Sequence, residues 1–442
     1  MFPMVSPIMG KAKTAVRVFA QHLFITLEIF HKNGLANHAA AGAYGFLLSA
    51  APMLLVISFF LIRAFRAAPE TAIAMARNVP FLDISFYENW PALEFLTSAP
   101  PGIPALVSMV GILWAGRIFA VSLHRGLKIV FEGKRKRNPL TENLVTLAIE
   151  FMMLVVMLAV IMGSRIALRL YDAVGFFGDT PLPRFLESMI GSQVLRLAVL
   201  GFLLYTAYRL IPANPPGRPA ALFGGVFCVV GYGAAAILFD AMLGHPRYNF
   251  LYGALGDLFV LLVSVYVFFL FLFLGAQFAA VADSFDALFF LRLREARFRA
   301  ARKPLDRLFG SIDGKLKKYH RFYRRGEIVL SKGDQGTDVY FLLEGEVEIL
   351  IPSGRDAWDS VGTLKPGSFL GEMGFLLSEG RTATIRATTD ARALALPSGL
   401  FETILESDVS LDRSIIENLS RRIKKGNERI AALEGVRQSG LP

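Results

Sequence analysis

Long apolar runs dominate the first two thirds of the chain, whereas short alternating segments fill the rest. A helix needs about 20 consecutive, mostly apolar residues to cross the hydrocarbon core of a bilayer. Six windows meet or approach that length: 39–62, 103–124, 144–164, 194–211, 220–243 and 258–282. The pattern predicts an all-α bundle of six transmembrane helices over residues 38–284, in which the fourth span is the shortest.

A second pattern begins after Arg324. Val339, Phe341 and Leu343 alternate with their neighbours along one segment, and glycines recur between such segments. Alternation with a period of two, interrupted by glycine turns, is typical of antiparallel strands. We therefore expect a β jelly roll or barrel with flanking helices over residues 305–435, which makes the chain a multi-domain protein.

Three further segments complete the domain organisation. Residues 1–37 predict an amphipathic helix on the membrane surface, and residues 285–319 predict basic connector helices without a flexible Gly/Ser linker. Residues 409–434 carry an apolar stripe at helical spacing, interrupted at Gly426. Because this stripe is too short for a stable coiled coil, we expect it to fold over the barrel.

The formal net charge of +11 comes from Lys and Arg that cluster beside the apolar windows. Cytoplasmic loops retain positive charge, so two clusters orient the bundle. They are residues 125–137 between the second and third windows, and residues 292–307 after the sixth. We expect a multi-pass protein of the bacterial inner membrane with both termini in the cytoplasm. The lipid bilayer is then its first partner, nucleic acid is not expected, and homo-oligomerisation stays open.

Catalytic and metal-ligating patterns are not evident in the membrane part. The six histidines form no pair with metal-ligand spacing, and the only cysteine, Cys228, lies in an apolar run. We expect neither a metal nor an enzyme. Glu150 is the deepest charge in a predicted span, so it is the candidate functional carboxylate of the bundle. Helix packing is the expected role of a set of small residues in the last two spans: Gly224, Gly225, Gly231, Gly233, Gly253, Gly256 and Gly275.

Four motifs in the membrane part carry a resemblance to a known family. They are AAAGAYGFLLSAAPMLL (39–55), VGILWAGRIFAVSLHRGL (110–127), YRLIP (208–212) and YNFLYGALGDLFVLLVSVYVFFLFLFLGAQFAAV (248–281). In this order and spacing they resemble the YihY/BrkB family of six-span inner-membrane proteins. The family was formerly labelled ribonuclease BN. The resemblance implies an envelope role, with transport or lipid chemistry as open alternatives.

A candidate anion site lies in the predicted barrel, in the stretch GEMGFLLSEGRTATIRA that starts at Gly371. A short helix after Gly371 would present backbone N–H groups, and Arg381 would supply a bidentate partner for a cyclic phosphate. Glu372 could accept a hydrogen bond from a ribose 2′-OH. Thr382 and Ala383 are small enough for the backbone to close on a ligand.

The context of this stretch makes it more specific than a lone acid and arginine. Together with GEIVLSKGDQGTDVYFLLEGEVEI (326–349), it resembles the Crp-like cyclic nucleotide-binding domain. By that resemblance Glu372 and Arg381 are the ribose and phosphate ligands, with Gly371, Met373, Thr382 and Ala383 adjoining. The implied ligand is cAMP or cGMP, with a slight preference for cAMP.

Three functions compete at this stage. The first is an envelope protein, with transport as one form of it, that is regulated by a cytoplasmic cyclic nucleotide sensor. The second is a membrane scaffold whose barrel is a ligand-free docking module. The third, a membrane-bound hydrolase or ribonuclease, is disfavoured because no residues support it.

Overall fold

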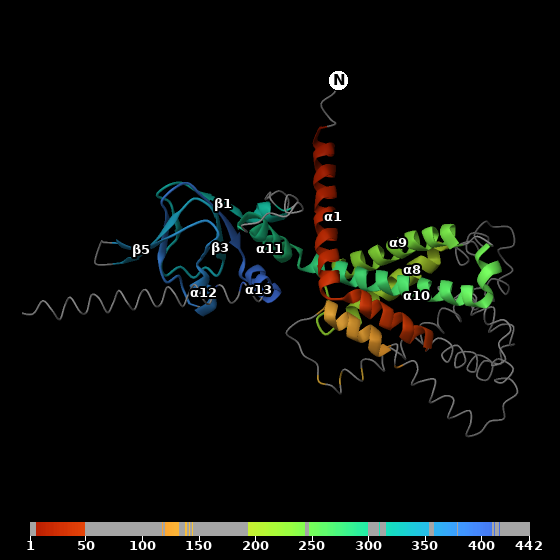
Figure 1. Cartoon of the computed structure of the whole chain (residues 1–442). Coiled ribbons are helices and arrows are strands. Elements are labelled where there is room, and N and C mark those ends of the chain that lie inside the picture. Colours follow the sequence, from red (N-terminus) through yellow and green to blue (C-terminus); the bar gives the residue numbers. More distant parts are fainter. Residues whose placement is uncertain are drawn as a thin grey trace, which may run out of the picture. The chain divides into compact units, whose positions relative to one another are not determined.

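The computed structural model describes part of the chain, and the predictions can be compared only there. The described residues are 6–48, 117, 120–131, 138, 141, 144, 193–243, 247–298, 309, 315–352, 358–377, 379–408, 411 and 415. Glu150 and most of the first three predicted spans lie outside this set, as does most of the predicted C-terminal helix. The chain divides into two compact units (Figure 1): a helical unit, Leu23–Asp283, and a sandwich unit made of Met1–His22 with Ser284–Pro442.

The helices of the described residues have the following bounds. They are α1 (Ser6–Lys32), α8 (Gln193–Leu210), α9 (Arg218–Leu243), α10 (Arg247–Asp283), α11 (Phe285–Phe298), the 3₁₀ helix η4 (Lys315–Tyr319), α12 (Glu372–Leu377) and α13 (Ser398–Ser407). Residues 35–48 and 120–130 are also helical. Gly34, with φ of 61°, separates α1 from the helix at 35–48.

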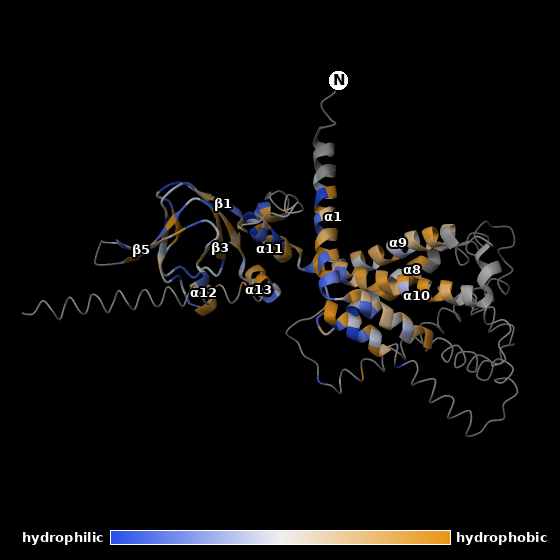
Figure 2. Ribbon diagram, viewed as in Figure 1, coloured by the Kyte–Doolittle hydropathy of each residue, from blue (hydrophilic) through white to orange (hydrophobic). Residues whose placement is uncertain are grey.

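Two described helices are long and apolar enough to cross a membrane. They are Arg218–Phe239 within α9 and Phe259–Asp283 within α10, and a shorter apolar stretch, Leu197–Leu210, lies within α8. All three overlap predicted windows, and Leu197–Leu210 lies entirely inside one. Figure 2 shows that apolar residues dominate these helices, as expected for helices that cross a membrane. The described residues therefore support a helical unit with several apolar helices, and six spans stay a prediction.

Close backbone contact joins α9 to α10. A methyl group added to Gly224 would lie 2.5 Å from the Gly275 carbonyl oxygen, and one added to Gly275 would lie 2.7 Å from the Gly224 oxygen. One added to Gly231 would lie 2.5 Å from the Phe271 ring. The packing role is thus confirmed for these three glycines. For Gly233 it stays a prediction, since no atom of the described residues lies within 4 Å of a Cβ added there.

A buried polar contact adds to this packing. The Tyr208 hydroxyl donates a hydrogen bond of 2.7 Å to the Leu272 carbonyl oxygen, and Tyr208 is fully buried between α8 and α10. Because bonded main-chain carbonyls inside a helix still have a free lone pair, the phenol is satisfied without breaking α10. The bond fixes the direction in which α8 meets α10.

The sandwich unit contains two four-stranded antiparallel sheets, ordered β1-β8-β3-β6 and β2-β7-β4-β5. The strands are β1 (His320–Tyr323), β2 (Ile328–Leu330), β3 (Val339–Glu344), β4 (Val347–Pro352), β5 (Trp358–Leu364), β6 (Phe369–Leu370), β7 (Thr384–Ala387) and β8 (Ala391–Leu396). Buried apolar residues of both sheets, among them Leu342, Val347 and Ile385, form a shared core. The predicted jelly-roll architecture of this part is confirmed.

Helix α11, which lies in the range predicted as a connector, packs on this sandwich. The Phe290 ring is fully buried and lies 5.0 Å from the Phe341 ring of β3 in an edge-to-face arrangement. Phe298 contacts Phe341 at 5.7 Å. Burial lowers the pKa of the Arg294 guanidinium on the same helix, and the Asp408 carboxylate just after α13 opposes this shift. The apolar side of α11 therefore belongs to the core of the sandwich unit.

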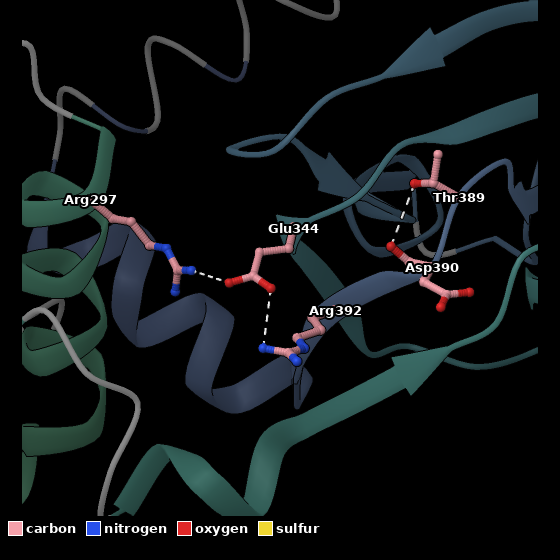
Figure 3. Close-up of polar contacts among 5 residues, drawn as sticks. All are labelled: Arg297, Glu344, Thr389, Asp390 and Arg392. Carbon is pink, nitrogen blue, oxygen red and sulfur yellow. Dashed lines mark hydrogen bonds and ion pairs between the residues drawn. The ribbon is translucent and has the colours of Figure 1, made fainter.

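An ionic link holds α11 to two strands (Figure 3). Glu344, at the end of β3, pairs with Arg297 of α11 through one carboxylate oxygen. Its other oxygen lies 3.2 Å from a guanidinium nitrogen of Arg392 on β8. All three side chains are partly exposed, so the two pairs contribute little stability at physiological salt. The packing of Phe290 and Phe298 on Phe341 is therefore the main attachment of α11 to the sheet.

Candidate functional site

The site begins at a sharp turn between β6 and α12. Gly371 has φ of 75°, which is unfavourable for residues with a Cβ. The six-residue helix α12 then begins at Glu372, which confirms the short helix expected after this glycine. Glycine is required at position 371 for a second reason, because a Cβ there would lie 2.6 Å from Nη1 of Arg381.

The Arg381 side chain lies inside the protein, with only 4% of its surface exposed. Its Nη1 donates a hydrogen bond of 2.9 Å to the Gly371 carbonyl oxygen, and its Nη2 donates one of 2.6 Å to the Asp338 carbonyl oxygen. Its Nε is buried without a hydrogen-bond partner. Within the described residues no carboxylate pairs with this guanidinium, so a buried cation is held by neutral carbonyl groups.

The loop between β2 and β3 fixes the backbone of Arg381. The Arg381 N–H donates to the Asp334 carbonyl oxygen at 2.9 Å, and the Gly333 N–H donates to the Arg381 carbonyl oxygen at 2.8 Å. Gly336 lies beside the guanidinium, because a Cβ there would be 3.4 Å from Nη2. Main-chain groups of this loop therefore hold the arginine in place without a bound ligand.

Glu372 lies in the first turn of α12 and is also buried, at 5% exposure. The Arg381 guanidinium lies against the same turn, since a Cβ at Gly374 would be 3.6 Å from Nη1. The structure thus brings the predicted acid and the predicted arginine to one short helix. A buried carboxylate and a buried guanidinium at a glycine-lined turn can hold a ligand that carries both a hydroxyl group and a negatively charged group.

The other predicted site residues of the sandwich adjoin this pair along the chain. Met373 and Ala383 are half-buried, whereas Thr382 is exposed. Glu150 lies outside the described residues, so its role stays a prediction. The sequence reasoning did not identify the loop residues that hold Arg381, namely Gly333, Asp334, Gly336 and Asp338. The two glycines in GDQGTD (333–338) indicate a turn, but they do not indicate that the turn contacts Arg381.

A glycine-lined turn, a buried arginine and two antiparallel sheets together define a class of ligand-binding domain. The family model "Cyclic nucleotide-binding domain" matches residues 320–408, which include β1 to α13. The family model "Virulence factor BrkB" matches residues 26–289, more than half of the chain. The chain therefore belongs to the BrkB family of membrane proteins and carries a cyclic nucleotide-binding domain behind the family's own domain.

Individual relatives include a membrane protein and a cAMP-dependent kinase subunit. A protein of Rhodopseudomonas palustris, whose name assigns it provisionally to the potassium channels, is 34% identical over 117 residues, which cover 26% of this chain and 28% of that protein. The UPF0761 membrane protein of Alkalilimnicola ehrlichii is 24% identical over 308 residues, covering 65% and 62%. The cAMP-dependent protein kinase regulatory subunit of Colletotrichum orbiculare is 30% identical over 102 residues, 23% of each chain. This chain spans less than two thirds of each of these relatives. Neither matched family is described as an enzyme.

Proposed function

We propose that the protein is an envelope protein of the bacterial inner membrane whose BrkB-family domain is regulated by a cyclic nucleotide. The nucleotide would bind at Arg381 and Glu372 in the sandwich unit. The observation that carries this proposal is the bonding of Arg381, a buried cation whose partners among the described residues are two main-chain carbonyl oxygens. A buried charge is stabilised by an opposite charge that also forms hydrogen bonds. A phosphodiester anion supplies both.

The residues around the arginine fit such a ligand. Arg381 Nε is a buried donor without a hydrogen-bond partner, and the glycines at 371 and 336 let the main chain approach the guanidinium closely, because a Cβ at either position would lie 2.6 Å or 3.4 Å from it. We assign the phosphate to Arg381 and the ribose hydroxyl to the Glu372 carboxylate. The similarity to a cAMP-dependent kinase regulatory subunit favours cAMP over cGMP. Transport is the form of output that we infer for the membrane domain.

Regulation needs a physical route from the ligand to the helical unit. Only Ser284 lies between the last residue of α10 and the first residue of α11, and α11 packs on the sandwich through Phe290. A helix anchored in this way can pass on a displacement that a flexible linker would absorb. The nucleotide can then bias the membrane domain by its differential affinity for two states, typically about 1–3 kcal/mol.

Binding is tested by isothermal titration calorimetry on a fragment comprising Ser284–Pro442, which keeps α11. We expect heat of binding with cAMP, and a weaker signal with cGMP. A fragment that folds but gives no heat with either nucleotide would contradict the proposal and favour a ligand-free docking module.

Access of the nucleotide depends on topology, which is a separate prediction. We propose six spans with both termini in the cytoplasm, because Lys and Arg flank the predicted inner ends. Alkaline phosphatase fused after Pro442 should be inactive, whereas green fluorescent protein at the same position should be fluorescent. Strong phosphatase activity would place the sandwich unit outside the cytoplasm and remove the nucleotide's access.

A further inference from the structure

An open groove runs between α8 and α9 on the surface of the helical unit. Its volume is about 600 Å³, and its lining is apolar except at one end, where Arg218 and Tyr205 lie. Leu222 and Val226 on its wall are 54% and 52% exposed, so the groove opens outward. In a membrane domain, such a surface faces the acyl chains of lipids.

Glycines create the groove by letting the two helices meet closely at its floor. A Cβ added to Gly225 would lie 3.4 Å from the Gly201 carbonyl oxygen, and one added to Gly201 would lie 3.7 Å from Cγ2 of Val229. Gly201 and Ala198 line the groove from α8 and fill little of it. The small residues therefore leave a channel beside the contact, instead of a flat surface.

The length of the groove matches one leaflet of a bilayer. On α9 its lining extends from Arg218 to Val230, twelve residues further along, which is about 18 Å at the helical rise of 1.5 Å per residue. Half of the hydrocarbon core is about 15 Å thick. An acyl chain that fills the groove would therefore place its headgroup at the Arg218 end.

The charge at that end is positive and available. Arg218 is exposed at the first residue of α9, and within the described residues it has neither an ion pair nor a hydrogen bond to its side chain. The nearby Arg209 differs, because its Nη1 donates to the Pro216 carbonyl oxygen at 2.6 Å. The Asp283 carboxylate accepts from the Gly217 N–H at 3.0 Å and comes from α10, whereas α8 and α9 line the groove.

We propose that this groove binds one anionic phospholipid, with an acyl chain between α8 and α9 and the headgroup phosphate at Arg218. Basic pockets between transmembrane helices near the membrane surface are suited to acidic headgroups. The length of the apolar groove is suited to an acyl chain, and the positive charge of Arg218 favours a lipid with an anionic headgroup. This site is independent of the cyclic nucleotide and of Arg381.

Fluorescence quenching by brominated lipids tests the site in the full-length protein. The three native tryptophans are replaced (W90F, W114F, W358F), and one probe is added as F223W, next to the groove on an exposed position of α9. The protein is reconstituted in phosphatidylcholine vesicles that contain brominated phosphatidylglycerol or brominated phosphatidylcholine. We expect the anionic lipid to compete for the probe site about fivefold better, as one basic side chain at a membrane surface would produce.

Two variants should remove this preference from opposite ends of the groove. R218Q removes the charge, and A198F fills the far end while leaving the charge in place. The matched control R125Q removes an exposed arginine from another helix and should keep the preference. A second probe, I237W in place of F223W, lies outside the lining on a residue that is 74% exposed, and should show none.

The proposal is overturned if both brominated lipids quench equally in the parent protein. It is also overturned if the preference survives R218Q, or if R218Q abolishes it while A198F has no effect, since the groove would then hold no lipid chain. Thermal unfolding monitored by circular dichroism must show that each variant is folded. If R218Q does not fold, R218K replaces it, and the preference should persist. If A198F does not fold, A198L replaces it, and the preference should be lost.

Discussion

Replacing Arg381 with leucine is expected to weaken cyclic nucleotide binding by about 2–5 kcal/mol, or roughly 30-fold to several thousand-fold. The ligand would lose the charge partner that we assign to its phosphate, at a site where Arg381 is 4% exposed and water cannot replace the guanidinium. Calorimetric titration of the Ser284–Pro442 fragment with cAMP measures the loss. A variant that binds as tightly as the parent fragment would show that the phosphate lies elsewhere.

Loss of binding must be separated from loss of folding. Leucine would leave the carbonyl oxygens of Gly371 and Asp338 without their donors, at about 1–3 kcal/mol each. Arg381→Lys keeps the charge without the fork geometry, so it should bind with intermediate affinity. Arg386→Leu is the matched control, because Arg386 is an exposed residue of the adjacent strand that pairs with Glu348 at 2.8 Å. It should leave binding unchanged.

Replacing Phe290 with alanine should lower the free energy of unfolding of the same fragment by about 3–5 kcal/mol. Its ring is fully buried against Phe341 and Phe369, at 5.0 Å and 6.2 Å between centroids, and alanine would leave a cavity. Urea denaturation of the fragment measures the change.

The matched control for this cavity is Phe298→Ala. Phe298 lies on the same helix and contacts the same Phe341 ring, but it is 39% exposed. Its loss should therefore cost clearly less than that of Phe290. Equal and small effects of both changes would mean that α11 is only loosely attached, which would remove the route that we propose for regulation.

The architecture of the sandwich unit could be predicted because short segments of the sequence determine its strands and turns. Alternating apolar residues from Val339 onward specify strands, and Gly371 followed by a short apolar segment specifies a turn and a helix. The joint role of Glu372 and Arg381 as ribose and phosphate ligands could be proposed because a carboxylate and a guanidinium are suited to those two groups. Both side chains are buried at the same turn in the structure.

The contacts that hold the arginine could not be predicted, for a physical reason. Its partners are main-chain carbonyl oxygens of Gly371 and Asp338, and every residue type carries such a group. The packing of α11 was also missed. Its phenylalanines are mixed with arginines, so the pattern indicated a basic connector, and only the position of Phe341 shows which side is buried. Spacing alone also does not reveal which glycines face a neighbouring helix, so the role of Gly233, which has no described atom within 4 Å of an added Cβ, stays a prediction.

The contact between Gly224 and Gly275 has a consequence for how the membrane domain can move. Each carbonyl oxygen lies where the other residue would carry a side chain, so the main chains of α9 and α10 are in direct contact. No flexible side chain lies between them that could change rotamer to let one helix slide past the other. A displacement at the end of α10 near Asp283 is therefore expected to shift both helices together. If the domain transports a substrate, as we propose, its gate is expected where this helix pair meets other helices, and not between α9 and α10.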